Sequence, residues 1–244
     1  MLERMQGSRA RYLVPNGITF LSLACGVAAI LASAADQLDT AGALILISYI
    51  LDLFDGELAR RLQAGSSFGL QLDSLVDMVS LGTAPAILAF SYLQDSLREN
   101  NLQWTLLWLL TILYTLAGAF RLARFNLLPM KQGQTASLGL TISTSGATLA
   151  LAVVSHQVTG AVAPPVLFLP LLLLLSLLMV SRIPHPSLTW LFSYRLVNLF
   201  YLAYFAVAFF IFRLPAVAVW FLFNVGYVGA ALTRSLLRGQ NEAG

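Results

Sequence analysis

Four aspartates in the first third of the chain have the spacing of a metal site. Asp52 and Asp55 are three residues apart, and Asp73 and Asp77 are four residues apart. Residues with these separations share one face of a helix, so each pair presents two carboxylates together. The turn-forming stretch 63–67 separates the pairs, and a helical hairpin there would bring all four carboxylates into one pocket.

Such a pocket favours bound cations, because four negative charges in a medium of low dielectric constant repel one another strongly. Ligands that are all oxygen suit Mg²⁺ or Mn²⁺, and also Ca²⁺. Two such ions stabilise the attacking and leaving oxygens in phosphoryl chemistry. Gly56, Ala59 and Gly69 leave room beside the acids, and the guanidinium of Arg60 can hold a phosphate. The residues predict a site for metal, polyphosphate and lipid.

The composition places these acids in a membrane protein. Charged residues make up only 10% of the 244 residues, hydrophobic residues make up 58%, and the mean hydropathy is +0.79. These values exclude the charged coat of a soluble domain and the polar composition of a disordered chain. A net charge of +3 without a basic run argues against a nucleic-acid partner. The single cysteine, Cys25, excludes a disulfide framework and a cysteine-based metal cluster.

We therefore predict an all-α integral membrane protein that forms one catalytic domain over residues 1–244. Apolar runs long enough to cross a bilayer predict about eight helices. They cover residues 15–35, 40–62, 71–93, 103–124, 137–156, 164–180, 188–212 and 215–237. Only the break at 182–186 separates the sixth helix from the seventh. The helices that bear the aspartates lie within residues 40–93, with the acids at one membrane face.

The basic residues predict that both termini are cytoplasmic. With this orientation, twelve basic residues face the cytoplasm: Arg4, Arg9, Arg11, Arg60, Arg61, Arg121, Arg124, Lys131, Arg182, Arg195, Arg234 and Arg238. Only Arg98 and Arg213 face the other side. This bias is typical of a multi-pass protein of the cell membrane whose aspartate site faces the cytoplasm. A cleavable signal peptide that ends near residues 32–34 is a rival interpretation of the first helix, but the length of the apolar run favours a retained helix.

Other functions fit parts of this pattern. Intramembrane aspartates also line ion and proton paths in transporters, which gives a competing function from another class. Two spaced pairs with a glycine and an arginine at fixed positions favour phosphoryl chemistry instead. Glu57 points away from Asp52 and Asp55 by helical phase, so we expect it to be solvated or to pair with Arg61.

The stretch that begins at Asp52 resembles the signature of the CDP-alcohol phosphotransferase family. It reads D-x2-D-G-x2-A-R-x8-G-x3-D-x3-D and matches all eight defined positions over 26 residues. The stretches 68–86, 121–126 and 180–187 resemble the phosphatidylserine synthases of this family, which eight spans fit better than the six usual elsewhere in it. The resemblance covers most of residues 12–190, and the last two predicted helices carry no recognisable motif.

The resemblance implies roles for individual residues. Asp52, Asp55, Asp73 and Asp77 would hold two Mg²⁺ or Mn²⁺ ions, and Asp77 would also accept a proton. The residues implied in binding CDP-diacylglycerol are Asn16, Thr19, Gly56, Ala59, Arg60, Ser66 and Gly69. The implied reaction transfers a phosphatidyl group from CDP-diacylglycerol to the hydroxyl of L-serine and releases CMP. The resemblance also implies a homodimer in the lipid bilayer.

The choice of acceptor depends on residues outside the signature. A serine site needs a cation for the carboxylate of serine, and Arg121 and Arg124 lie at the cytoplasmic end of the fourth predicted helix, with Asn126 after them. Both arginines could instead anchor the protein to lipid phosphate. Glycerol phosphate, inositol phosphate or choline are alternative acceptors for the same chemistry.

Overall fold

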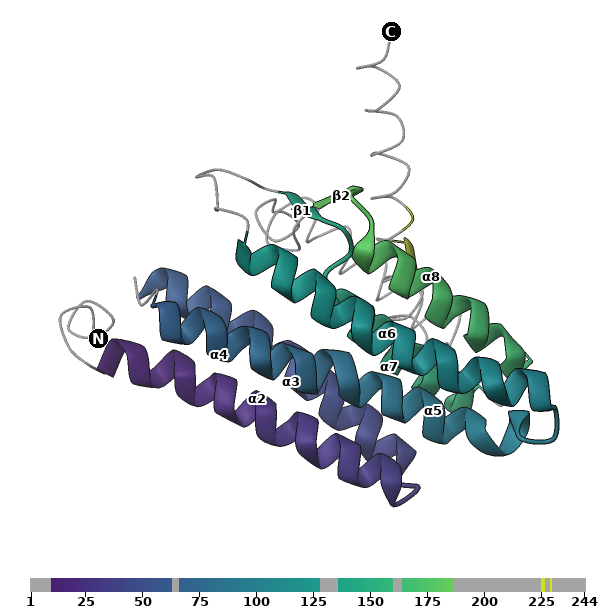
Figure 1. Cartoon of the computed structure of the whole chain (residues 1–244). Helices are drawn as coiled ribbons and strands as arrows, with labels where there is room; N and C mark the ends of the chain where they lie inside the picture. Colours follow the sequence, from purple (N-terminus) through teal and green to yellow (C-terminus); the bar gives the residue numbers. More distant parts are fainter. Residues whose placement is uncertain are drawn as a thin grey trace, which may run out of the picture.

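The computed structural model describes residues 10–62, 66–127, 136–159 and 164–186, together with the isolated positions 225, 226 and 229. In these ranges the chain is almost entirely helical, which agrees with the predicted fold class (Figure 1). The helices are α2 (Ala10–Ala34), α3 (Leu38–Arg61), α4 (Ser67–Asp77), η1 (Met78–Thr83), α5 (Ala84–Leu97), α6 (Asn101–Leu127), α7 (Ile142–Val158), η2 (Pro165–Leu167) and α8 (Phe168–Val180).

Six of the eight predicted membrane helices fall on described residues. Within the described ranges, three segments are both long and apolar enough to cross a membrane, and they are Tyr12–Ala34, Ser67–Leu97 and Asn101–Leu127. Helix α3 carries four acidic residues along its 24 residues, and α7 is only 17 residues long. The predicted helices 188–212 and 215–237 lie outside the described residues, apart from the three isolated positions.

The third predicted helix, 71–93, is longer than expected and changes its winding in the middle. Helix α4 begins after Ser66, whose side chain accepts a hydrogen bond from the backbone of Gly69 at 3.0 Å. A six-residue π-helix, η1, follows directly after Asp77 and leads into α5. Segments of this kind often occur at functional sites, and this one immediately follows a predicted catalytic aspartate.

The fifth predicted helix, 137–156, corresponds to α7, which starts five residues later than predicted, at Ile142. Residues Ala136–Leu138 form strand β1, which pairs antiparallel with β2 (Pro184–Pro186). Gly139 follows with a φ of +78°, a conformation that glycine adopts without steric cost and that interrupts a helix. Thr141 then caps α7 by accepting a hydrogen bond from the backbone of Thr144 at 3.2 Å. The predicted break at 182–186 is confirmed, because α8 ends at Val180 and residues Pro184–Pro186 form strand β2.

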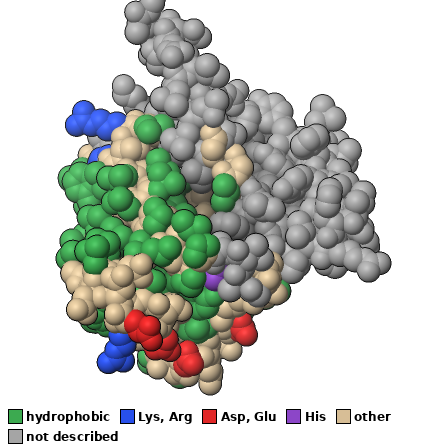
Figure 2. Space-filling view, turned by 90° about the vertical axis from the view of Figure 1, so that its right-hand side faces the viewer, with side chains coloured by type: hydrophobic (Ala, Val, Ile, Leu, Met, Phe, Trp, Pro, Cys, Tyr) green, Lys and Arg blue, Asp and Glu red, His purple; other side chains and the backbone are tan. Residues whose placement is uncertain are grey.

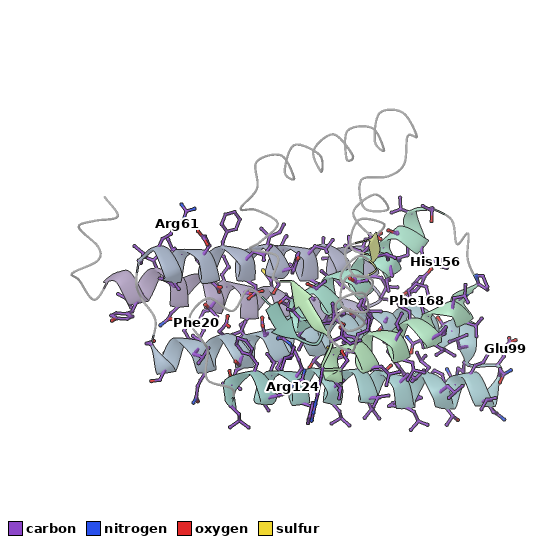
Figure 3. The ribbon with its side chains drawn as sticks, turned by 90° about the horizontal axis from the view of Figure 1, so that it is seen from above. Phe20, Arg61, Glu99, Arg124, His156 and Phe168 are labelled. Carbon is purple, nitrogen blue, oxygen red and sulfur yellow. The ribbon has the colours of Figure 1, made fainter. Side chains whose placement is uncertain are left out.

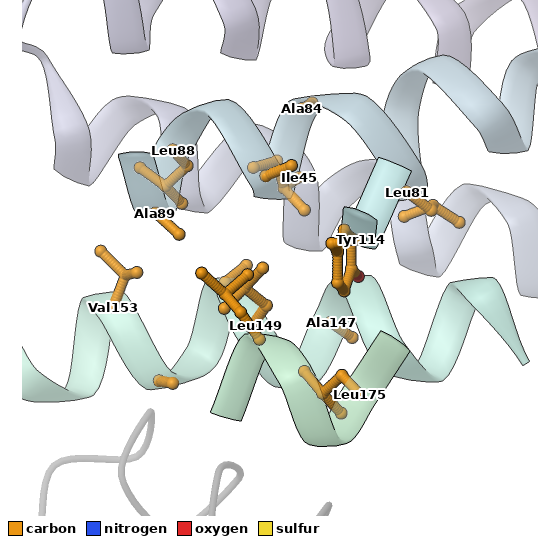
Figure 4. Close-up of a cluster of buried hydrophobic side chains, with 14 of the residues drawn as sticks. Ile45, Leu81, Ala84, Leu88, Ala89, Tyr114, Ala147, Leu149, Val153 and Leu175 are labelled. Carbon is orange, nitrogen blue, oxygen red and sulfur yellow. The ribbon is translucent and has the colours of Figure 1, made fainter. Parts of the chain in front are cut away.

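Helix α7 forms the centre of the described bundle. Leu149 and Val153 of α7 face Ile45, Leu88 and Tyr114 from three surrounding helices (Figure 4). Gly146 allows a close approach of α7 to η1, because a Cβ atom added to it would lie 2.2 Å from the carbonyl oxygen of Leu81. A buried α7 therefore fixes the relative positions of α3, η1, α5 and α6.

Three serines connect α2, α3 and η1 inside the bundle. The hydroxyls of Ser22 and Ser48 lie 2.7 Å apart, and Ser80 donates to the carbonyl oxygen of Ser22 at 3.1 Å. Gly26 of α2 packs so tightly here that an added Cβ atom would lie 2.2 Å from the Ser80 hydroxyl. The contacts hold α2 against the two segments that carry the aspartates.

The outer helices expose large apolar side chains, as a lipid-facing surface requires. Leu13, Phe20, Leu109, Leu116 and Phe120 of α2 and α6 are each more than half exposed. Figure 2 shows hydrophobic side chains over much of one described face, with acidic and basic side chains in small groups. Arg61 and Glu99 lie at opposite ends of the bundle (Figure 3). We name the end where α3 finishes and α4 begins the aspartate end.

Candidate active site

Helices α3 and α4 bring the predicted metal ligands together. Asp52, Asp55 and Asp73 each place a carboxylate oxygen within 4.8 Å of the other two. Asp77, which is 8% exposed, lies within hydrogen-bonding reach of Asp52. The four carboxylates thus form one cluster, as the helical spacing predicts, although residues 63–65 of the intervening turn lie outside the described residues.

Asp55 shows that the cluster suits a cation. Its side chain is 4% exposed, and its Oδ2 atom accepts a hydrogen bond from the hydroxyl of Thr19 at 2.7 Å. Its Oδ1 atom is buried and has no hydrogen-bond partner among the described residues. A buried carboxylate oxygen without a partner is costly, and a divalent ion between the three aspartates would satisfy it.

The start of α7 contributes a residue that the sequence analysis missed. Ser143 lies within hydrogen-bonding reach of the Asp52 carboxylate. The sequence holds a signal for this residue, because four of residues 141–146 are serine or threonine, at the start of an otherwise apolar helix. Helical phase within α3 and α4 could not reveal this contact, since α7 is remote in sequence.

Arg121 is the basic residue of α6 that faces the aspartates. Its side chain is only 7% exposed, and its charge interacts with those of Asp77, Asp52 and Asp73. The guanidinium also lies over the ring of Phe125, with 5.5 Å between its carbon and the ring centroid. Arg121 therefore offsets part of the repulsion among the carboxylates.

Arg124 and Asn126 have other partners. Arg124 donates hydrogen bonds to the carbonyl oxygens of four residues: Val180 and Leu138, both at 2.8 Å, Ser181 at 3.0 Å and Met179 at 3.3 Å. The amide of Asn126 donates to the hydroxyl of Ser74 at 3.0 Å, which ties α6 to α4. Of the three residues predicted to bind serine, Arg121 is the one whose charge interacts with the aspartates.

Several residues predicted to contact CDP-diacylglycerol meet at the start of α4. Asn16 of α2 approaches Gly69, because a Cβ atom added to Gly69 would lie 3.5 Å from the Asn16 Oδ1 atom and 3.1 Å from the Ser66 hydroxyl. Thr19 lies one turn after Asn16 and binds Asp55, as described above. The structure gives Thr19 and Ser66 local partners, and their contact with substrate stays a prediction.

The remaining predicted contacts lie on the last two turns of α3. A Cβ atom added to Gly56 would have no atom within 4 Å, so there is open space beside this residue. Ala59 is half-buried, and the side chain of Arg60 lies outside the described residues. Arg61 donates to Glu57 at 2.7 Å, which is the second of the two predicted alternatives for Glu57 and leaves it outside the aspartate cluster.

A helical membrane protein with clustered aspartates and a buried arginine beside them has the parts of an enzyme that acts on phosphate groups with divalent ions. A profile of the CDP-alcohol phosphatidyltransferase family matches residues 12–183, and the chain belongs to this family. The predicted family is therefore confirmed, and its members generally use a divalent metal.

Proteins of similar sequence with named activities indicate which branch of the family this chain resembles. A protein of Helicobacter pylori is 32% identical over 180 residues, which cover 72% of this chain and 73% of the relative. A protein of Methanocaldococcus jannaschii is 33% identical over 178 residues, which cover 71% and 74%. A protein of Bacillus subtilis is 31% identical over 173 residues, which cover 71% and 89%. All three are named CDP-diacylglycerol–serine O-phosphatidyltransferase.

Proposed function

We propose that the chain transfers the phosphatidyl group of CDP-diacylglycerol to the hydroxyl of L-serine and releases CMP. The names of its relatives supply the substrates. The observation that carries the chemistry is the cluster of Asp52, Asp55 and Asp73, in which a buried oxygen of Asp55 lacks a hydrogen-bond partner. This arrangement supports metal-assisted phosphoryl transfer better than an ordinary buried ion pair.

We propose Asp52, Asp55, Asp73 and Asp77 as ligands of two Mg²⁺ or Mn²⁺ ions. When bound, these ions would neutralise negative charge on the diphosphate and on the leaving group. Thr19 orients Asp55 through its hydrogen bond, so that one oxygen of the carboxylate points toward the cluster.

The chain's own residues position the lipid substrate. Asn16, Ser66 and Gly69 line the start of α4, and the open space beside Gly56 leaves room for the nucleotide. Ala59 and Arg60 lie one turn further along α3, where Arg60 would hold a phosphate. The acyl chains would lie between helices in the cytoplasmic leaflet.

Asp77 accepts the proton of the serine hydroxyl in this proposal. The hydroxyl oxygen then attacks the phosphorus that bears diacylglycerol, the bond from that phosphorus to the bridging oxygen breaks, and CMP leaves. Asp77 lies within the carboxylate cluster beside Asp52, which is where the acceptor hydroxyl must be held. Much of the rate must come from this positioning of the two reactants.

Arg121 is our proposed partner for the carboxylate of serine. Divalent ions that bind the aspartates would compete with Arg121 for the same carboxylates, which makes its donors available to an anionic substrate. The four carbonyl partners of Arg124 and the Ser74 partner of Asn126 make these two residues weaker candidates for serine binding.

The membrane arrangement is also a proposal. We propose eight helices in a single domain over residues 1–244, with both termini and the aspartate end in the cytoplasm, on the basis of the bias in basic residues. The start of α2, the end of α3 and the start of α4 lie at the same end of the bundle, which fits this orientation (Figure 1). A homodimer would use surfaces other than Gly118 and Gly146, because both pack against neighbours inside the chain.

An acceptor screen tests the function. Purified protein is incubated with CDP-diacylglycerol, Mn²⁺ and, in separate reactions, serine, glycerol phosphate, inositol phosphate or choline, and CMP is measured. We expect CMP with serine, its loss with a chelator and its return with Mn²⁺. CMP formation with another alcohol but not with serine would overturn the choice of acceptor. An ion transporter would release no CMP in any reaction.

A further inference from the structure

The ends of α6 and α8 and the strand β1 meet at one side chain. The guanidinium of Arg124 donates to the carbonyl oxygens of Met179, Val180 and Ser181 at the end of α8, and to that of Leu138 in β1. The last carbonyls of a helix lack partners within the helix, and a cation there also complements the helix dipole. We call this set of contacts the Arg124 clamp.

Gly139 makes room for the clamp. Its φ is +78°, and an added Cβ atom would lie 2.5 Å from the Met179 carbonyl oxygen and 2.9 Å from the Arg124 Nη2 atom. Its backbone N–H donates to Ile183 at 2.9 Å, and the next residue, Leu140, donates to Leu178 at 3.0 Å. The chain leaving β1 is therefore held against the end of α8 by backbone and side-chain bonds together.

The clamp lies directly before the part of α7 that reaches the aspartates. Ile142 is fully buried, and its side chain fills the space above two glycines, because Cβ atoms added to Gly82 and Gly118 would lie 3.0 and 2.8 Å from it. Ser143 follows and reaches Asp52. The position of the Gly139 turn thus sets where Ser143 can lie.

We propose that Arg124 is a positioning residue which, through the clamp, fixes the start of α7 and so holds Ser143 against Asp52. A lysine would replace it only in part, because four carbonyls at the end of α8 and in β1 need the fork of donors that only arginine has. In this role Arg124 acts on the aspartate cluster through α7 and does not touch serine.

A double-mutant cycle between the two sides of the clamp tests the proposal. Arg124→Ala removes the donors, and Gly139→Ala pushes a methyl group into the space that the guanidinium occupies while leaving the charge in place. If both act by opening the clamp, the double variant should match the stronger single variant instead of multiplying the two effects. The steady-state parameters for serine, CDP-diacylglycerol and Mn²⁺ are measured for all four proteins.

We expect each single variant to lower kcat about tenfold and to raise the Mn²⁺ concentration for half-maximal activity about tenfold, because partners behind a metal ligand typically contribute that much to metal affinity. The KM values for serine and for CDP-diacylglycerol should change by the same small factor. Mn²⁺ binding measured without substrates should weaken in parallel. Arg98→Ala, on the exposed opposite end, is the control for loss of one positive charge.

Hydrogen exchange gives a readout that does not depend on activity. The backbone amides at positions 139 and 140 should exchange faster in Arg124→Ala and Gly139→Ala and at the native rate in Arg98→Ala. If Arg124→Ala does not fold, Arg124→Lys is measured instead, and it should show an intermediate loss of amide protection and of Mn²⁺ affinity.

Two outcomes would overturn the clamp. One is a serine KM that rises alone in Arg124→Ala, with multiplicative effects in the double variant, since this identifies Arg124 as a ligand of serine. The other is native amide exchange and native Mn²⁺ binding in both single variants. The kinetic readout rests on the proposed transferase function, whereas the exchange and binding readouts do not. Wild-type protein that releases no CMP would contradict the function and leave the exchange test intact.

Discussion

Arg121 and Arg124 lie one helical turn apart on α6 and have opposite surroundings. Arg121 is buried, and its charge interacts with three aspartates of the cluster. Arg124 is less buried, and its hydrogen-bond partners within the described ranges are backbone carbonyls at the end of α8 and in β1. Figure 3 shows Arg124 about midway along the length of the bundle, at a distance from Arg61 at the end of α3. Residue type and sequence position therefore do not distinguish their roles, but their partners do.

The difference has a chemical consequence. Carboxylates are the groups that metal ions and substrates compete for, so a guanidinium among them takes part in any change of charge at the site. Backbone carbonyls do not change charge, so a guanidinium bound to four of them has a constant environment. We infer that Arg121 belongs to the reaction and Arg124 to the framework that positions it.

The largest effect is expected from a change in the aspartate cluster that interacts with Arg121. Asp77→Asn keeps the shape of the side chain and removes its ability to accept a proton. We expect kcat to fall by about 10²- to 10⁴-fold, the range for loss of a general base, while nucleotide binding partly survives. CMP release and CDP binding are the measurements. Asp95→Asn, an exposed acid on α5, is the control, and near-native turnover in Asp77→Asn would remove Asp77 from the role of base.

Arg121→Ala tests whether Arg121, in contrast to Arg124, binds the carboxylate of serine. Loss of a charge-assisted hydrogen bond to the carboxylate of serine should raise the serine KM about tenfold to a hundredfold, and the KM for CDP-diacylglycerol much less. Arg121→Lys should recover part of the loss, because lysine keeps the charge without the planar fork. Equal increases of both KM values would place Arg121 in general folding or lipid binding and abolish the contrast with Arg124.

The sequence predicted the features that depend on residues close together in the chain. Helical spacing predicted that Asp52 and Asp55 share one helix face and that Asp73 and Asp77 share another. It also predicted the contact between Glu57 and Arg61 as one of two alternatives. The signature predicted the family, which the profile match confirms. Each of these inferences needs only the pitch of a helix or the identity of a few spaced residues.

Contacts between remote segments could not be predicted in this way. Nothing local distinguishes Arg124 from Arg121, because three of the four carbonyls that bind Arg124 lie at the end of α8, more than fifty residues later. The early start predicted for the fifth helix fails for the same reason, since the turn at Gly139 is stabilised by Ile183 and by the end of α8. Ser143 was missed because its partner, Asp52, lies on another helix.

A smaller effect is expected from the residue behind a single aspartate. Thr19→Val is nearly isosteric and removes the hydrogen bond to the Asp55 Oδ2 atom. We expect the apparent affinity for Mn²⁺ to fall about tenfold, because a partner behind a ligand fixes its orientation. A Mn²⁺ titration of CMP release measures it. Thr105→Val on the exposed start of α6 should show no change, and an unchanged titration in Thr19→Val would mean that Asp55 is oriented by other contacts.

The smallest effect should come from the end of the bundle opposite the aspartates. There the hydroxyl of Tyr92 bonds with the Nδ1 atom of His156, and the rings of both residues pack edge-on against Phe168. Tyr92→Phe removes one hydrogen bond and keeps the ring contacts, so it should cost about 1 kcal/mol of stability and lower the unfolding temperature by a few degrees. Its kinetic constants should equal those of the native protein, because Tyr92 and His156 are remote from Asp77 and from the Arg124 clamp. A changed Mn²⁺ requirement in Tyr92→Phe would show that packing anywhere in the bundle alters the cluster, and the separate roles assigned to Arg121 and Arg124 would then lose their basis.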